Sequence, residues 1–264
     1  MKKLFKLLAV AAVVIVSATS SHAALHTNTF GTSLTSGTGG GASDCDDCFT
    51  GPISFMGLNQ RINFFGIAYI GLFIGSNGYV TFGAGARDFI SEPLNTETKI
   101  GPMIAGFFTD LDSRDDPTSN VYINDATPGQ LIATWEGMGH FSRNYSGRST
   151  FQLVVRSDQF LAAAGEGQIG FFYGAITDPS SASAGFGDGL AAVNLGEIAF
   201  LSLAEGTQVS NNAPRWFNLN GGIPTPNAIP EPGTLALFGL AVAGLGLVRR
   251  RAQAVELAQK PKLV

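Results

Sequence analysis

The chain has 264 residues, of which 45% are hydrophobic and 14% are charged, and its formal net charge is −4. Eight of its 16 Lys and Arg residues lie in the terminal segments, so residues 24–228 carry 8 basic against 18 acidic side chains, a net charge of about −10. A body this acidic excludes nucleic-acid binding, which needs basic patches. It favours a soluble protein that attracts cations.

The first 23 residues predict a secretory signal peptide. Three lysines precede the uncharged apolar run 7–17, and small residues lead up to Ala23. A basic start, an apolar stretch and a small-residue site predict a signal helix that is cleaved after Ala23. The apolar run is too short to span a bilayer in the mature protein.

Residues 24–52 are rich in Gly, Ser and Thr and are predicted to form a flexible lead. They hold the two cysteines of the chain, Cys45 and Cys48, in the sequence Asp-Cys-Asp-Asp-Cys. In an exported protein such a pair predicts a disulfide. A redox pair, a metal-ligand pair and two free thiols are the alternatives. A redox pair favours a helix N-terminus, however, and a zinc site needs two further Cys or His ligands.

Residues 53–210 predict one all-β domain, a single antiparallel β-sandwich. Segments rich in β-branched and aromatic residues recur between turn signals such as Asn77-Gly78, and no long segment has a helical apolar period. Short strands at this spacing are typical of sandwiches and barrels. The expected strands are 61–74 (broken at Gly66 and Gly71), 79–82, 103–108, 121–123, 131–135, 150–156, 168–173 and 197–203.

The C-terminal part begins with residues 211–228, which are rich in Pro, Asn and Gly and predict a linker. A three-part segment follows over 229–251, and it consists of a Pro-Glu-Pro motif, the uncharged apolar run 234–248 and three arginines. That run would be roughly 22 Å long as a helix, whereas a bilayer core is roughly 30 Å thick. It predicts a short transmembrane helix that anchors the chain transiently, with residues 252–264 as a cytoplasmic tail after the basic cluster.

The order of these three parts resembles the PEP-CTERM sorting signal of exopolysaccharide-producing bacteria. The residues that carry the resemblance are Pro230, Glu231 and Pro232, and then Arg249, Arg250 and Arg251. The resemblance implies recognition by exosortase, a membrane transpeptidase that cuts near the Pro-Glu-Pro motif. It also implies transfer of the protein to the cell surface or the extracellular matrix.

The body resembles a NIDO domain, the extracellular domain first named in nidogen. The segments that match in order over about 60–205 are Asn77–Phe82, Ile104–Asp112, Asn120–Tyr122, Thr134–Trp135, Thr150–Gln152 and Ile169–Gly174. The resemblance implies an extracellular, adhesive or matrix-associated protein without catalytic activity.

An acidic stretch after the buried-looking strand 103–108 is the candidate metal site. Because alternate residues of an extended chain point the same way, the carboxylates of Asp110 and Asp112 are expected to face one ion. Calcium takes six to eight hard oxygen ligands, and further ligands are expected from Asp115, Asp116 and Asn120. The alternative is a solvated acidic turn in which Arg114 pairs with the carboxylates.

Three other sets of residues are candidates for catalysis or sugar binding. Asp110 and Glu136 are a candidate carboxylate pair for glycoside hydrolysis. His140 with Ser142 and Asp110 suggests a catalytic triad, but the sequence has no Gly-x-Ser-x-Gly elbow. Exposed aromatic side chains can stack on sugar rings, and the candidates are Tyr122, Tyr145 and Trp216.

Taken together, these features predict a secreted, surface-sorted, non-enzymatic matrix or adhesion protein associated with exopolysaccharide or biofilm. Its expected partners are exosortase, the membrane before processing, and a matrix polysaccharide or other surface proteins. Calcium is the one expected ligand ion. The alternatives are a surface carbohydrate-binding protein and a secreted glycan hydrolase.

Overall fold

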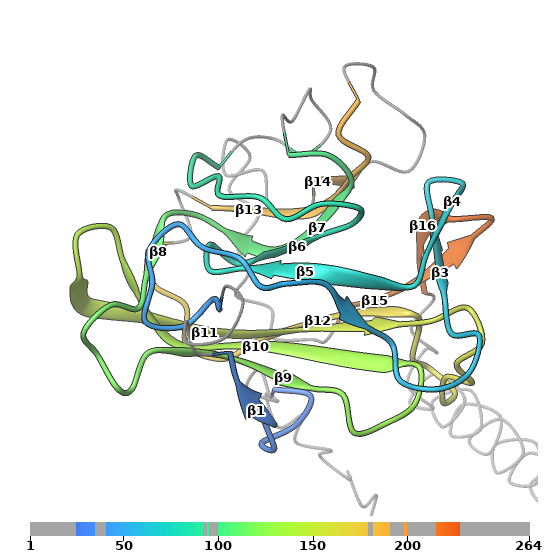
Figure 1. Ribbon diagram of the computed structural model, residues 1–264, viewed down its shortest axis with the longest axis horizontal. Coiled ribbons are helices and arrows are strands. Elements are labelled where there is room, and N and C mark those ends of the chain that lie inside the picture. The colour runs from blue at the N-terminus through green and yellow to red at the C-terminus, as the bar shows by residue number, and fades with distance from the viewer. Residues whose placement is uncertain are drawn as a thin grey trace, which may run out of the picture.

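The computed structural model describes residues 25–34, 41–91, 94, 100–178, 182–190, 198–199 and 215–227. Over these ranges every regular element is a β-strand, and all the strand pairs are antiparallel (Figure 1). The predicted all-β fold is therefore confirmed. The predicted signal helix and C-terminal transmembrane helix lie outside these ranges. Within them, no helix is long and apolar enough to cross a membrane.

The larger of two main sheets has eight strands in the order β1-β9-β10-β11-β12-β15-β16, and β8 pairs with β10 beside β9. Its centre is the long hairpin of β10 and β11. The bounds are β1 (Thr32–Ser33), β8 (Leu111–Asp112), β9 (Asn120–Asn124), β10 (Gln130–His140), β11 (Asn144–Arg156), β12 (Ile169–Tyr173), β15 (Arg215–Asn220) and β16 (Ile223–Pro226).

The smaller main sheet has six strands in the order β14-β13-β7-β6-β5-β2. The turn predicted at Asn77-Gly78 joins β5 to β6, and Gly78 has a φ of 84°, which only glycine adopts at low cost. A separate hairpin pairs β3 with β4. The bounds are β2 (Ile53–Ser54), β3 (Ile62–Phe64), β4 (Ile67–Tyr69), β5 (Gly71–Gly75), β6 (Tyr79–Thr81), β7 (Met103–Phe108), β13 (Ser183–Gly187) and β14 (Ile198–Ala199).

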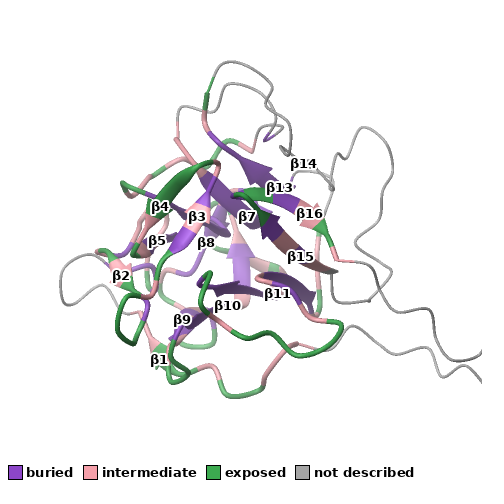
Figure 2. Ribbon diagram, turned by 90° about the vertical axis from the view of Figure 1, so that its right-hand side faces the viewer, coloured by how far each residue is buried: buried purple, intermediate pink, exposed green. Residues whose placement is uncertain are grey.

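The two main sheets enclose a shared core, which Figure 2 shows as buried ribbon on both sides. Trp135 of β10 stacks on Phe151 of β11 with ring centroids 4.9 Å apart, and Phe151 also meets Phe107 of β7. The Trp135 indole N–H donates across the sandwich to the carbonyl of Gly75 at 2.9 Å. Each buried aromatic side chain contributes roughly 1.5–3 kcal/mol, and this hydrogen bond fixes how the sheets face one another.

The segment predicted as a linker, 211–228, holds β15 and β16, which extend the larger sheet. Phe217 packs on Phe171 and Phe186, with ring centroids 5.6 and 4.9 Å apart. The alternation of buried and less buried residues along β15 is the period of a strand. Pro224 and Pro226 are compatible with β16 because it is the last strand at that edge.

The predicted flexible lead, 24–52, also contributes to the described structure. Residues 25–31 lie over the larger sheet, where His26 meets Phe172 and Trp216, and β1 then pairs with β9. Thr27 and Gln152 exchange two hydrogen bonds, of 3.2 and 2.9 Å. Ser43 is buried and exchanges hydrogen bonds with the backbone of Val121. Polar contacts hold this segment, which is why its low apolar content was a poor guide.

Candidate functional site

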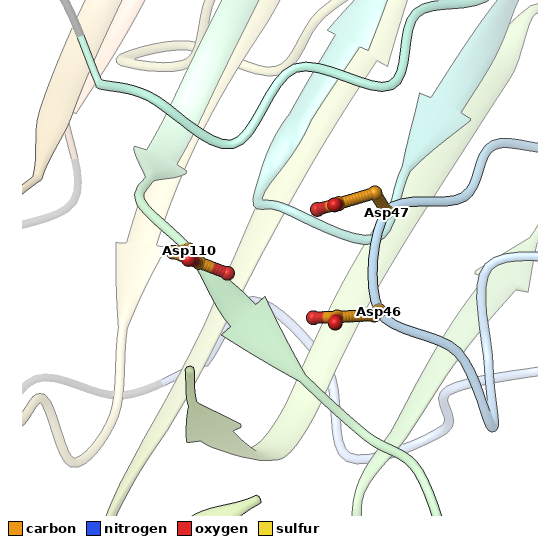
Figure 3. A group of neighbouring side chains, drawn as sticks. All are labelled: Asp46, Asp47 and Asp110. Atoms are coloured by element: carbon orange, nitrogen blue, oxygen red, sulfur yellow. The ribbon is translucent and has the colours of Figure 1, made fainter. Parts of the chain in front are cut away.

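Three carboxylates converge where the loop before β2 meets the junction of β7 and β8. Asp46, Asp47 and Asp110 each place a carboxylate oxygen within 4.8 Å of the others, and Figure 3 shows the three side chains pointing toward one another. All three residues are half-buried. We call these residues the carboxylate cluster.

The two cysteines hold the loop that supplies Asp46 and Asp47. Cys45 and Cys48 are joined in a disulfide with their Cα atoms 6.0 Å apart, so the two aspartates are the residues enclosed by the bridge. On one side, Ser113 N–H donates to the carbonyl of Cys45 at 3.1 Å. On the other, Ser76 N–H donates to the carbonyl of Cys48 at 2.8 Å. The short bridge therefore fixes the position of both carboxylates.

Asn77 connects the two parts of the cluster. Its side-chain amide donates to Asp47 Oδ1 at 2.9 Å, and its side-chain oxygen accepts from the backbone N–H of Leu111 at 2.8 Å. The amide also donates to the carbonyl of Asp88. Asn77 is almost fully buried, so the turn residue of β5 and β6 is also the residue that links Asp47 to the chain after Asp110.

The carboxylates of the cluster repel one another. Burial, together with the neighbouring carboxylates of Asp46 and Asp47, raises the pKa of Asp110 to about 6. Burial also raises the pKa of Asp46, against the effect of Arg114, whose guanidinium lies 2.8 Å from Asp46 Oδ2. The other oxygen, Asp46 Oδ1, is buried and has no hydrogen-bond partner among the residues that the structure describes.

This arrangement has the chemistry of a hard-cation site. Carboxylate oxygens are the ligands that calcium prefers, and a cation would offset the burial of charge and the repulsion that together raise the pKa of Asp110. The residues that could hold it are Asp46, Asp47 and Asp110, two from the disulfide loop and one from the end of β7.

Of the five residues predicted to surround calcium, only Asp110 lies in the carboxylate cluster. Asp112 is fully buried and accepts hydrogen bonds from the Arg114 side chain at 2.9 and 2.5 Å. Burial alone would raise the pKa of Asp112, but these bonds and the backbone N–H of Arg143 lower it below its usual value. The alternative, a solvated acidic turn paired with Arg114, agrees with the partner of Asp112 but not with its burial.

The other three predicted ligands have separate contacts. Asp115 pairs with Arg143 at 3.0 Å on the surface. Asp116 accepts hydrogen bonds from Thr118 and pairs with Arg148, and these contacts lower its pKa to about 2. The side-chain amide of Asn120 donates to the carbonyl of Pro117 at 2.9 Å. Ion pairs with arginine therefore hold the two aspartates of this loop, and the three side chains do not surround a common ion site.

The candidate catalytic residues have contacts of other kinds. Burial and the nearby carboxylate of Glu136 raise the pKa of Tyr122, whereas Asp110 faces Asp46 and Asp47. His140 Nε2 is buried and has no hydrogen-bond partner within the described ranges, so it makes no such contact with Ser142. None of these contacts joins Asp110 to Glu136 or His140 to Ser142, as the proposed pair and triad would need.

The aromatic candidates for sugar stacking pack against the protein itself. Tyr145 donates its hydroxyl to the carbonyl of Arg114 at 2.6 Å, and Arg148 lies over its ring. Tyr122 meets Phe30 with ring centroids 5.6 Å apart. Trp216 lies on the outer face of the larger sheet, where Arg156 covers its ring at 4.5 Å.

Comparison with known proteins identifies both parts of the chain. The family model described as NIDO related matches residues 18–221, more than half of the chain. The PEP-CTERM protein-sorting motif matches residues 228–251, which contain the Pro-Glu-Pro motif and the three arginines. No curated protein and no solved structure matches the chain. The predicted cleavage residue Ala23 and the sorting residues Pro230, Glu231, Pro232, Arg249, Arg250 and Arg251 lie outside the described ranges.

Both predicted resemblances are therefore confirmed, and with them the exported, surface-sorted class of the protein and its sorting by exosortase. The chain belongs to the NIDO-related family and carries a PEP-CTERM protein-sorting motif.

Proposed function

We propose that the protein is a non-enzymatic matrix or adhesion component that is displayed at the cell surface with exopolysaccharide or in a biofilm. One observation carries this proposal: a β domain of the NIDO-related family is followed directly by a sorting motif. The last described strand, β16, ends at Pro226, and the motif match begins at residue 228. The tail delivers the domain to the extracellular matrix after a transient stay in the membrane, and the domain makes the contacts there.

The carboxylate cluster supports a cation-dependent mode of adhesion. An acidic domain and an acidic polysaccharide repel one another, and a divalent cation held by Asp46, Asp47 and Asp110 would bridge them. The matrix polysaccharide is therefore the proposed partner, and calcium is the proposed bridge. The three converging oxygens are the support for this step.

A sorting experiment tests the delivery. The wild-type chain should be found with the cells and the matrix, whereas a chain that lacks 230–251 should appear in the culture medium. The control is a chain that lacks 252–264, which should be sorted like the wild type. An unchanged distribution of the 230–251 deletion would defeat the proposal.

A binding experiment tests the contact. The purified domain should sediment with matrix polysaccharide when calcium is present and should stay in solution with a chelator. Asp110→Asn should lose the calcium-dependent part, whereas Asp125→Asn removes the same charge from the turn between β9 and β10 and should keep it. Binding without calcium would instead support a carbohydrate-binding surface elsewhere on the domain.

The absence of catalysis is part of the proposal. The support for this part is that Asp110 gathers with Asp46 and Asp47, an arrangement that suits a cation, whereas Glu136 lies beside Tyr122. The purified protein should release no reducing sugar from the matrix polysaccharide. Sugar release that Glu136→Gln abolishes would overturn this part.

A further inference from the structure

The described chain begins and ends at the same place on the domain. The ring of His26, on the segment that crosses the larger sheet, lies 5.6 Å from the ring of Trp216 in β15. The backbone N–H of Asn227, directly after β16, donates to the carbonyl of Trp216 at 2.8 Å. The points where the described chain begins and ends, near His26 and at Asn227, therefore both lie beside Trp216.

An exposed apolar loop lies at this same place. It connects β11 to β12 and has the sequence Phe-Leu-Ala-Ala-Ala over 160–164, with Leu161 95% exposed. Arg156 lies over the rings of both Phe160 and Trp216, each at 4.5 Å. The carbonyl of Glu166, at the end of the loop, accepts from the Asn227 side chain at 2.8 Å. We call His26, the loop 160–164, Trp216 and Asn227 the exit corner.

The charges at the exit corner suit a lipid surface. The loop 160–164 carries no charge, and the acid that follows it, Glu166, is paired with Arg156 at 2.7 Å. Asp158, which precedes the loop, is exposed and accepts hydrogen bonds from the Asn63 backbone N–H and the Gln168 side chain. The corner thus presents fewer acids than the carboxylate cluster, and the repulsion from anionic headgroups is weaker there. A single exposed leucine needs no explanation on its own. Leu161, however, lies on the loop that leads to Glu166, whose carbonyl holds Asn227, the last described residue before the sorting motif.

The reach of the chain places the corner near the membrane. From Asn227 to Pro230, three residues span at most roughly 10 Å, and to Thr234, where the apolar run begins, seven residues span at most roughly 24 Å. The predicted signal cleavage at Ala23 lies three residues before His26, again roughly 10 Å at most. The apolar run that remains after signal cleavage is therefore joined to this corner by a short stretch of chain.

We propose that the exit corner faces a phospholipid bilayer while the chain carries its sorting segment, and that Leu161 enters the bilayer interface. The inference rests on the proposed membrane retention by the tail, and it adds an orientation. The turn between β10 and β11 lies at the other end of the long hairpin, and its Phe141 N–H donates to the carbonyl of Asp110. The carboxylate cluster would thus point away from the membrane, toward the matrix.

Depth-dependent fluorescence quenching tests this orientation on the full chain. The chain is reconstituted into vesicles of phosphatidylethanolamine and phosphatidylglycerol that carry a lipid-borne quencher. A polarity-sensitive dye is attached at Leu161→Cys, with the Cys45–Cys48 disulfide left unreduced. The matched control is Phe141→Cys, because Phe141 is also a large exposed apolar side chain, 65% exposed, at the opposite end of the hairpin.

The expected result is loss of fluorescence at residue 161 and none at residue 141. If the protein floats with the vesicles and the residue 161 label keeps its fluorescence, or if both labels are quenched alike, the proposed orientation is wrong and retention by the tail still stands. If the chain does not float with the vesicles, both the retention and the orientation are wrong. Because Leu161 is almost fully exposed, the substitution leaves the fold intact, and an unchanged melting temperature checks this.

Discussion

At the scale of single residues, Asp110 is where burial and charge oppose one another most clearly. Its folded pKa is about 6, above the ordinary value of 3.8, so the native state binds more protons than the unfolded state between about pH 4 and pH 6. The free energy of unfolding therefore falls as the pH rises through that window, because ionising Asp110 costs more in the folded protein.

Asp110→Asn should remove this cost. In metal-free buffer at pH 7 we expect the variant to be more stable by about 1 kcal/mol once solvent screening is considered, which is a rise of about 3 °C in melting temperature. The pH dependence between 4 and 6 should flatten. Asp125→Asn is the control and should leave both unchanged. A lower melting temperature for Asp110→Asn in metal-free buffer would show that the carboxylate is not under repulsion.

Calcium should reverse the order of the melting temperatures, so that the wild type becomes more stable than Asp110→Asn. A ligand that binds only the folded state at a hundred times its dissociation constant stabilises by about 2.7 kcal/mol, so the melting temperature of the wild type should rise as calcium is added. Asp110→Asn should lose most of that rise, and Asp125→Asn should keep it. The measurement is a calcium titration of the melting temperature, and a flat titration of the wild type would remove the site.

Asp112 and Asp115 are close in sequence, but replacing each by alanine should change the stability of the protein by very different amounts. Asp112 is fully buried and accepts from Arg114 Nε and the Arg143 backbone N–H, so Asp112→Ala removes the acceptor of both donors and should cost about 3 kcal/mol. Asp115 pairs with Arg143 on the surface, and Asp115→Ala should cost less than about 1 kcal/mol. Urea unfolding of both variants measures the difference, and equal losses would contradict it.

The lowered pKa of Asp112 also predicts how the stability difference between the wild type and Asp112→Ala depends on pH. Because this pKa is lowered in the folded protein, the stability from Asp112 is present above the ordinary pKa and is lost as the pH falls through the folded value. Wild type and Asp112→Ala should therefore become more alike in acid.

At the scale of elements, the hairpin of β15 and β16 should be needed for folding. A chain that ends at residue 228 keeps Phe217 and Leu219 on the core, whereas one that ends at 212 leaves β12 as an open edge and exposes Phe171. We expect the longer fragment to melt cooperatively and the shorter one to aggregate. The test is the expression of both fragments, starting at residue 24, with the same export signal. Equal stability would show that 211–228 acts as a linker.

Most strands could be predicted because their apolar residues are concentrated in short runs between glycines, as in β3, β4 and β5. β15 was missed because it has only two inward apolar residues, Phe217 and Leu219, in a stretch rich in Asn and Pro. The segment before β1 was missed because hydrogen bonds such as those between Thr27 and Gln152 leave no apolar pattern.

The candidate site could be predicted only in part. Asp110 was found because it follows a buried strand, but its neighbours Asp46 and Asp47 are distant in sequence, and only the folded chain brings them together. The signal for them was the short disulfide loop, which encloses two acids and fixes where they point. The number of acids at 110–116 suggested a cation site, but Asp112, Asp115 and Asp116 pair with nearby arginines instead.

At the scale of the whole molecule, the domain and the sorting motif point to the same destination. A NIDO-related domain is placed outside the cell by a PEP-CTERM motif that begins directly after its last described strand. If the exit corner faces the membrane, the domain leaves its acidic cluster free for the matrix before and after processing.

The intact mass of the mature protein, isolated from the surface of the producing cells, tests the central claim that the tail is a sorting signal. We predict a mass that lacks residues 1–23 and the residues beyond the Pro-Glu-Pro motif at 230–232, with any attached group measured as the excess. A mass that still includes the apolar run 234–248 and the arginines after it would contradict the claim, because the tail would then be a permanent part of the protein.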